Sequence, residues 1–79
     1  MLIFKATVIT PNKVLYEGEA WSVFLPGLTG EFEVLELHRD IMSLLREGNI
    51  VINWEKEIPV KIGAVRMSGD ELVAIVEAD

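Results

Sequence analysis

The sequence predicts an all-β domain built as a sandwich or flattened barrel of many short strands. Apolar and β-branched segments alternate with turn-forming residues at intervals of roughly eight positions. No segment sustains the helical periodicity of about 3.6 residues. The chain has 79 residues, of which 51% are hydrophobic, so its length allows one compact core. We therefore expect a single domain that covers residues 1–79.

The amino-terminal half carries four extended segments separated by turn residues. Polar and apolar residues alternate in these segments, which is the period-2 pattern of a strand. Pro11-Asn12-Lys13 predicts a tight reversal, Gly18 predicts a bend, and the proline and glycines within 26–30 predict a loop. The strands are expected at residues 2–9, 14–17, 20–25 and 31–37.

The carboxy-terminal half predicts two hairpins. Residues 41–45 lie too close to Gly48 for a stable helix, so we expect extended or irregular backbone there. In the last connection Gly69 supplies the positive φ that a short turn needs. The first hairpin joins residues 49–54 to 57–62 through Glu55-Lys56, and the second joins 65–67 to 72–76 through Ser68-Gly69-Asp70-Glu71.

Composition excludes several classes of function. The net charge of -6 repels phosphate backbones, so we expect no nucleic-acid binding. The absence of cysteine removes disulfides and thiolate metal sites. The longest apolar stretches fall far short of the roughly 20 residues that cross a bilayer, so we expect no direct membrane insertion and a soluble chain.

The residues that carry catalytic chemistry are few. His38 is the single histidine, and Glu36 and Asp40 would lie on its side of a strand and could form an acid–base cluster with it. A lone histidine in a loop is more often a solvated polar contact. We therefore expect no catalytic residue, no metal site and no cofactor.

Two further patterns could suggest ligand binding. The glycines of Gly27-Leu28-Thr29-Gly30 superficially match a phosphate loop, but no Lys-Ser or Lys-Thr follows, so a tight turn between strands is the better interpretation. Trp21, Phe24, Phe32 and Trp54 could stack bases or sugars, yet the acidity opposes bases. Core packing is expected for two of these four aromatic side chains.

Short motifs follow one another in a fixed order along the whole chain. They are Thr10-Pro11, residues 15–20, Ser22-Val23, Leu25-Pro26-Gly27, Gly30-Glu31-Phe32, Val34-Leu35, His38, Ser43-Leu44-Leu45 with Gly48, Gly63, Leu72-Val73 and Glu77-Ala78. In order and spacing these motifs resemble the amino-terminal domain of F-type ATP synthase epsilon subunits. The resemblance implies a flattened β-sandwich of about ten short, mainly antiparallel strands, which agrees with the pattern of the residues.

The same resemblance implies a mechanical function. Such a domain is a non-catalytic part of the central stalk, with one side docked on the gamma subunit and one end resting on the polar loops of the membrane c-ring. It would support the coupling of ion translocation to ATP synthesis, while the nucleotide sites lie on other subunits. Its expected location is peripheral, at the cytoplasmic face of the bacterial inner membrane.

Individual contact residues follow from matching positions. Glu31 and His38 match positions near the ring-facing loops of the family, and Arg39 beside His38 is assigned to the ring side with them. A carboxylate at Glu31 would accept hydrogen bonds from the ring loops or pair with a basic side chain there. Trp21, if it faces solvent, would be an anchor for the gamma subunit, because buried aromatic side chains dominate interface energetics.

The chain departs from the family pattern at several places. Glu33 stands where a glycine is usual, residues 36–40 replace a Pro-Gly-His-Ala-Pro run, and Trp21 replaces a charged residue. The sequence ends at Asp79, where family members commonly continue into a two-helix hairpin. We therefore expect the helical domain to be absent and expect no ATP binding by this chain.

Two other classes of protein remain as alternatives. A lipoyl- or biotinyl-carrier domain has a similar size and acidity but needs a lysine at a hairpin tip, for which Lys56 is the candidate. A small hydrolase or isomerase would need an assembled catalytic set, which the sequence does not present.

Overall fold

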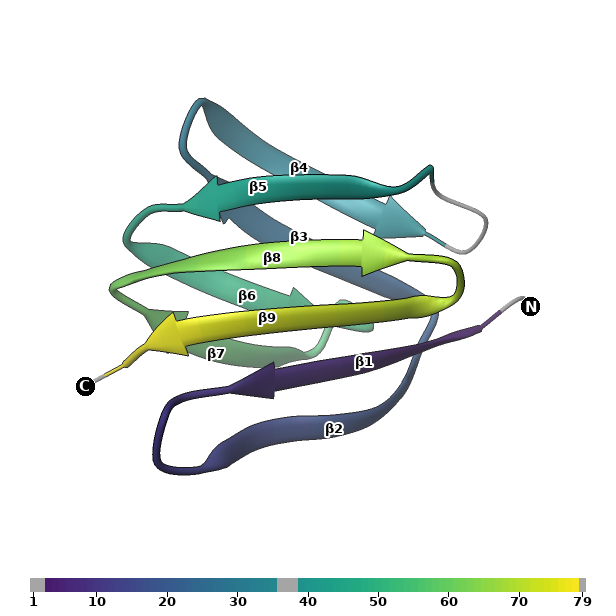
Figure 1. Ribbon diagram of the computed structural model, residues 1–79, viewed down its shortest axis with the longest axis horizontal. Coiled ribbons are helices and arrows are strands. Elements are labelled where there is room, and N and C mark those ends of the chain that lie inside the picture. The colour runs from purple at the N-terminus through teal and green to yellow at the C-terminus, as the bar shows by residue number, and fades with distance from the viewer. Residues whose placement is uncertain (1–2, 36–38, 79) are drawn as a thin grey trace.

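The structure of the chain is a computed structural model that describes residues 3–35 and 39–78. These residues form nine strands and no helix (Figure 1), so the prediction of an all-β domain is confirmed. The strands are β1 (Phe4–Ile9), β2 (Val14–Ala20), β3 (Ser22–Gly27), β4 (Gly30–Leu35), β5 (Ile41–Leu45), β6 (Gly48–Ile52), β7 (Lys56–Val60), β8 (Ile62–Ser68) and β9 (Glu71–Glu77).

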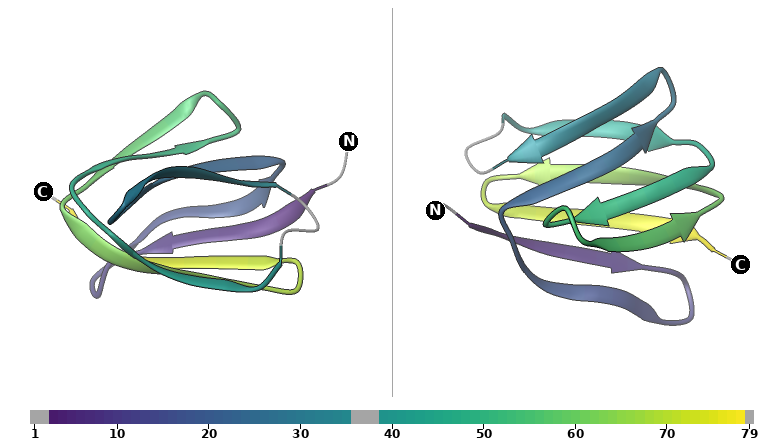
Figure 2. Two further views of the ribbon diagram at one scale, coloured as in Figure 1. Left: turned by 90° about the horizontal axis from the view of Figure 1, so that it is seen from above. Right: turned by 180° about the vertical axis from the view of Figure 1, so that it is seen from behind.

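The strands form one continuous sheet that folds over into two layers. Its order is β2-β1-β9-β8-β5-β3-β6-β7, with β4 paired to β3. Strands β2, β1, β9, β8 and β5 make the first layer, and β4, β3, β6 and β7 make the second (Figure 2). Every pair of strands is antiparallel except β1 and β9. The expectation of a sandwich with mainly antiparallel strands is therefore confirmed.

The two layers meet where β3 pairs with β5. Gly27 is the partner of Leu45 in this ladder. The backbone N–H of Leu28 donates to the carbonyl of Leu44 at 3.0 Å, and that of Arg46 donates to the carbonyl of Pro26 at 2.9 Å. The sheet turns this corner without a break in hydrogen bonding, which gives the molecule a shape close to a barrel.

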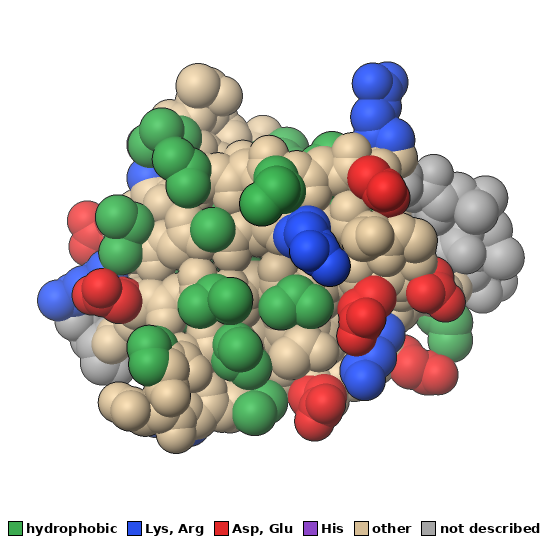
Figure 3. Space-filling view, in the orientation of Figure 1, with side chains coloured by type: hydrophobic (Ala, Val, Ile, Leu, Met, Phe, Trp, Pro, Cys, Tyr) green, Lys and Arg blue, Asp and Glu red, His purple; other side chains and the backbone are tan. Residues whose placement is uncertain are grey.

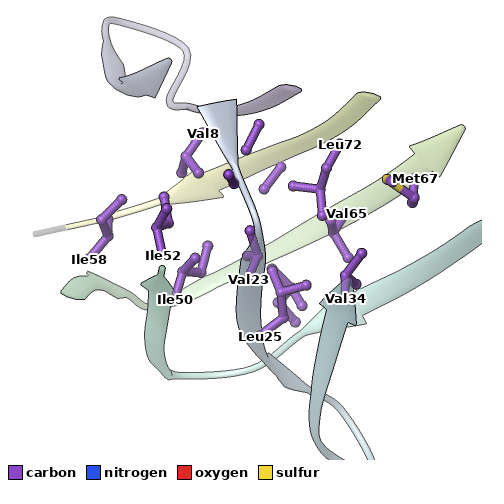
Figure 4. Packing of buried hydrophobic residues seen from close by; sticks show 14 of the residues in the cluster. Val8, Val23, Leu25, Val34, Ile50, Ile52, Ile58, Val65, Met67 and Leu72 are labelled. Atoms are coloured by element: carbon purple, nitrogen blue, oxygen red, sulfur yellow. The ribbon is translucent and has the colours of Figure 1, made fainter. Parts of the chain in front are cut away.

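The core lies between the layers and follows from alternation along each strand. In β9, Leu72, Ala74 and Val76 are buried while Ile75 is exposed, because successive side chains point to opposite faces. Figure 4 shows the buried side chains of both layers pointing toward one another. They are Phe4, Ala6, Val8, Ala20, Leu45, Val65, Met67, Leu72, Ala74 and Val76 from the first layer and Val23, Leu25, Val34, Ile50, Ile52, Ile58 and Val60 from the second.

Two predicted turns have the expected chemistry. The backbone N–H groups of Asn12 and Lys13 donate to Oγ1 of Thr10 at 3.2 and 3.1 Å, which stabilises the reversal after β1. Gly69 adopts a φ of 64° between β8 and β9, as expected for a short hairpin turn. Its N–H donates to Oδ1 of Asp40 at 3.1 Å, so a second loop braces this turn.

Two expectations about the amino-terminal half are wrong. The loop expected over 26–30 is shorter, since Pro26 and Gly27 complete β3 and pair with Glu31 and Gly30 of β4. Gly18 does not bend the chain but continues β2 opposite Ala6. In both places the cross-strand ladder continues through residues that favour turns on their own.

The turn between β6 and β7 also differs from the prediction. It is centred on Asn53 and Trp54, which have positive φ values of 55° and 63°, and not on Glu55-Lys56. The N–H of Glu55 donates to the carbonyl of Ile52 at 3.1 Å and closes a four-residue turn. Asn tolerates this left-handed conformation, whereas a bulky tryptophan rarely adopts it.

Candidate functional site

The features of the described residues that stand out are exposed surfaces. Within residues 3–35 and 39–78, no three His, Cys, Asp or Glu side chains converge to hold a metal ion. Nor does that part of the chain contain a helix long and apolar enough to cross a membrane. The two surfaces that stand out lie on the outward faces of the two layers.

The outward face of the first layer is apolar over β5, β8 and β9. Met42 is 81% exposed, Leu44 61%, Ile62 57% and Ile75 54%, although all four are large hydrophobic side chains. Figure 3 views this face and shows hydrophobic side chains gathered across its middle. We call Met42, Leu44, Ile62 and Ile75 the apolar face.

The register of the strands explains why these side chains form one surface. Leu44 pairs with Ala64, and Ala64 pairs with Ile75, so the three side chains form a row across three strands. Ala64 is small and leaves an open hollow of about 490 Å³ between its larger neighbours, lined also by Leu28 and Ile62. A hollow rimmed by apolar side chains accommodates an apolar side chain from another molecule.

Charged residues border the apolar face at one end. Lys5 and Glu71 pair across β1 and β9, and Nζ of Lys5 lies 4.0 Å from Oε2 of Glu17 on β2. Arg66 pairs with Val73 on the same side of the layer. Figure 3 shows more charged side chains toward the right-hand end of the face than toward the left-hand end. An apolar centre with a charged border is the usual composition of a protein–protein interface.

The outward face of the second layer carries an aromatic cluster made of Trp21, Phe24 and Trp54. The rings of Trp21 and Trp54 are stacked with centroids 6.4 Å apart and an interplanar angle of 17°. The ring of Phe24 meets that of Trp54 edge-on at 5.6 Å. None of the three is in the buried core, and Trp54 is 64% exposed. Core packing was expected for two of the four aromatic residues, but of these four only Phe32 packs against the core, and it is only partly buried.

Hydrogen bonds fix the indole of Trp54 in this cluster. Its Nε1–H donates to Oγ of Ser22 at 3.0 Å and to Oε2 of Glu33 at 3.0 Å. The hydroxyl of Ser22, a fully buried residue, donates to the same carboxylate oxygen at 2.5 Å. The N–H of Trp21 donates to Oδ1 of Asn53 at 2.8 Å, which holds the β6–β7 turn against β3. These hydrogen bonds hold Trp21 and Trp54 in place in the cluster.

The structure separates the residues that were assigned to the ring side. Glu31 is exposed near the start of β4, beside the β3–β4 turn. Arg39 is exposed beyond the opposite end of the same six-residue strand. Such a strand spans about 17 Å, so the two side chains do not share one contact point. His38 and Glu36 lie outside the described residues.

Other predicted positions fall in the second layer or at its turns. Trp21 is half-buried because Trp54 stacks on it, so part of its ring faces solvent. Trp21 belongs to the aromatic cluster, and Glu33 accepts a hydrogen bond from the indole of Trp54 in that cluster. Asp40 braces the turn at Gly69. Lys56 is exposed as the first residue of β7, immediately after the hairpin tip.

The apolar face was not among the features predicted from the sequence. A signal for it is present in residues 72–76, where every position is apolar, so that both faces of the strand are hydrophobic. A strand with one face in the core and an equally apolar outward face is expected where a second surface covers it. The identity of the outward set could not be read from the sequence, because either parity of the pattern would form a core.

Comparison with known proteins places this architecture in one family. The family model described as the beta-sandwich domain of the ATP synthase delta/epsilon chain matches residues 3–78. The ATP synthase epsilon chain of Sulfurimonas denitrificans is 39% identical, over 94% of this chain and 72% of the relative. That of Chlorobium limicola is 28% identical, over 94% of this chain and 89% of the relative.

Longer relatives and a solved structure agree with this assignment. The epsilon chain of a Sulfurovum species is 35% identical over 98% of this chain, which spans 63% of that relative's length. A chain in the structure of the central stalk and c-ring of the Tetrahymena thermophila mitochondrial ATP synthase superposes with a TM-score of 0.77 at 14% identity. That match covers 94% of this chain and 63% of the other and shows a common fold. From the family model and the identity with epsilon chains, we conclude that this chain belongs to the ATP synthase delta/epsilon family and forms its β-sandwich domain.

Proposed function

We propose that this chain is a non-catalytic subunit of the central stalk of a rotary F-type ATP synthase, where it links the gamma subunit to the membrane c-ring. Membership of the epsilon-chain family supports this role. The observation that carries it is the apolar face, since a domain that docks on a rotating shaft needs a large dry contact. In this role the domain supports the coupling of ion translocation to ATP synthesis.

The apolar face is the proposed contact with the gamma subunit. Met42, Leu44, Ile62 and Ile75 together leave hydrophobic area in water that the domain itself does not bury. Covering such area gains about 25 cal/mol per Å² of apolar surface removed from water. The hollow around Ala64 would receive one apolar side chain of the partner. Trp21, which lies on the second layer, is outside this contact.

The end of the sandwich that carries Glu31 is the proposed contact with the c-ring. The β3–β4 turn with exposed Leu28 lies at this end, and Arg46 of the β5–β6 turn lies next to it. Nε of Arg46 donates to the carbonyl of Gly27 at 3.2 Å and fixes the two turns together. Glu31 therefore presents its carboxylate beside two turns that this hydrogen bond holds together. A contact through Arg39 would need the opposite end of β4, so Glu31 is the ring residue that we retain.

The proposed contact with the c-ring also implies where in the cell the domain would lie. The c-ring is a membrane component, and the proposed contact with it is through polar loops. The domain would therefore sit peripherally at the cytoplasmic face of the bacterial inner membrane, held there by its partners.

Co-purification with the gamma subunit of the same organism tests the proposal. Leu44→Glu and Ile75→Glu each place a charge in the apolar face, whereas Asn49→Glu places the same charge on the exposed surface of the second layer. We expect the wild type and Asn49→Glu to retain the gamma subunit and the two apolar-face variants to lose it, because an unpaired charge in a dry interface is costly. Retention by all four proteins, or by none, would contradict the proposal.

A further inference from the structure

We propose that the aromatic cluster on the second layer is a second docking surface, and that it takes an arginine-bearing segment of another protein. The cluster lies on the side of the sandwich opposite the apolar face, so both surfaces can be occupied at once. This inference does not depend on the contacts with the gamma subunit and the c-ring proposed above. It rests on the conformation of Trp54, on the fixed position of its indole, and on the charges around it.

Trp54 occupies a turn position that a tryptophan rarely adopts. Its φ of 63° is left-handed, where a bulky side chain is an outlier. Its side chain is also 64% exposed, so the domain recovers only part of the gain from burying an indole. Strained backbone of this kind persists where surrounding contacts enforce it and is concentrated at binding sites. Here the enforcing contacts are the hydrogen bonds from the indole to Ser22 and Glu33.

Carboxylates flank the aromatic cluster in a row across the second layer. Glu33 pairs with Phe24, Phe24 pairs with Val51, and Val51 pairs with Glu57, so these four side chains face outward together across β4, β3, β6 and β7. Phe24 and Val51 are half-buried and Glu57 is exposed. Trp54 packs against Phe24 in the middle of this row. The surface is thus an aromatic and aliphatic strip with a carboxylate at each end.

An arginine side chain complements this strip. A guanidinium is attracted to the face of a tryptophan and pairs with a carboxylate, and its aliphatic stem packs on apolar side chains. The net charge of -6 disfavours a second copy of the chain, a nucleic acid or an anionic lipid surface as the occupant. The chemistry of the row therefore points to a basic segment of a protein.

Nuclear magnetic resonance on the 79-residue chain tests the proposal directly. The chain has two tryptophans, so its indole N–H region contains two resonances, and Trp54→Phe identifies the one from Trp54. The probe is a synthetic peptide of alternating alanine and arginine, compared with the same peptide in which citrulline replaces arginine. We expect the arginine peptide to shift the indole resonance of Trp54 and the backbone resonances of Val51 and Glu57. The uncharged citrulline peptide should bind at least about two- to fivefold more weakly, the range for an exposed cation–π contact.

A pair of charge-neutralising variants separates a specific site from general attraction to an acidic protein. Glu33→Gln keeps an oxygen acceptor for Trp54 and Ser22 but removes the charge, whereas Glu47→Gln removes one exposed charge from the β5–β6 turn. We expect Glu33→Gln to weaken binding by about two- to fivefold and Glu47→Gln to leave it nearly unchanged. Equal losses in both variants, equal binding of the citrulline peptide, or shifts confined to other parts of the chain would overturn the proposal.

Discussion

At the scale of single residues, Asn53 determines how Trp54 is presented. Its φ of 55° is tolerated by asparagine, and its Oδ1 accepts the N–H of Trp21 at 2.8 Å and that of Ser22 at 3.4 Å. Its own N–H donates to the carbonyl of Ser22 at 2.7 Å. One side chain therefore joins the β6–β7 turn to the start of β3.

Replacing Asn53 separates the contribution of its side-chain hydrogen bonds from the contribution of its backbone conformation. Asn53→Ala should lower the free energy of unfolding by about 2–4 kcal/mol, because it loses the hydrogen bonds to partly buried N–H groups and the polar side chain that lets asparagine tolerate positive φ. Asn53→Gly keeps the conformational freedom and should cost about 1 kcal/mol less. Urea unfolding of both variants measures the difference. Equal losses would show that the backbone conformation adds nothing to the effect of the lost hydrogen bonds.

Glu31 is the residue that we propose for the contact with the c-ring. Glu31→Lys should weaken association with the c-ring by about tenfold or more, because like charges placed together at an interface cost several kcal/mol. Glu31→Ala should have a smaller effect. Glu71→Lys makes the same charge reversal at the opposite end of the sandwich and serves as the control. Reconstitution with purified ring measures the affinity, and indistinguishable binding of the variants at Glu31 would remove it from the interface.

At the scale of elements, close packing between β8 and β9 fixes the first layer. A Cβ at Gly63 would lie 2.6 Å from the carbonyl oxygen of Ile75 and 2.7 Å from Cγ1 of Val76, so the strands approach more closely than a side chain permits. This contact lies directly beneath the hollow of the apolar face. The shape of that face therefore depends on a glycine in β8, one of the strands that form it.

Gly63→Ala should destabilise the domain by about 1–3 kcal/mol, since the clash is with backbone and cannot be relieved by a rotamer change. Gly18→Ala is the matched control, because a Cβ there would meet only the side chain of Tyr16, at 3.3 Å from its hydroxyl. Thermal unfolding should show a lower midpoint for Gly63→Ala by about 4–8 °C per kcal/mol and little change for Gly18→Ala. Similar midpoints for the two variants would contradict the packing argument.

At the scale of the whole molecule, this is a small domain that leaves much of its hydrophobic surface uncovered. Domains of this size are stable by only about 0.05–0.15 kcal/mol per residue. Its two outward faces differ in character, with an aliphatic surface on one side and an aromatic, acidic strip on the other. Partner contacts at these faces would contribute a large share of the stability that the assembled subunit has.

A partner that binds only the folded chain must raise its unfolding temperature. At a gamma-subunit concentration of one hundred times the Kd, the gain is about 2.7 kcal/mol, which corresponds to roughly 10–20 °C for a domain of this size. Leu44→Glu should leave the midpoint of the isolated chain nearly unchanged, because Leu44 is 61% exposed, yet should abolish the rise. A rise that persists in this variant would show that the gamma subunit binds elsewhere.

Local patterns in the sequence predicted part of the fold and part of the candidate site. The alternation within each strand predicted the all-β class, and Gly69 and Pro11-Asn12-Lys13 predicted turns that form as expected. The motifs around Gly30-Glu31-Phe32 predicted the family, which the matching family model shows. These features depend on neighbouring residues, so the sequence by itself determined them.

Only the tertiary structure shows the features of the fold that depend on long-range contacts. The sequence does not predict that β1 pairs with β9, or that β3 lies between β4 and β6. The choice of partner strands depends on contacts between residues that are far apart in the chain, and no local pattern specifies it. Residues 72–76 are apolar at every position, so only packing of the layers showed that Ile75 faces outward. Trp54 adopts a turn conformation that tryptophan disfavours. Its indole is held there by Ser22, Glu33 and Trp21, which lie far from it in the sequence. Local preference is worth about 1 kcal/mol per residue, and several tertiary contacts acting together outweigh it.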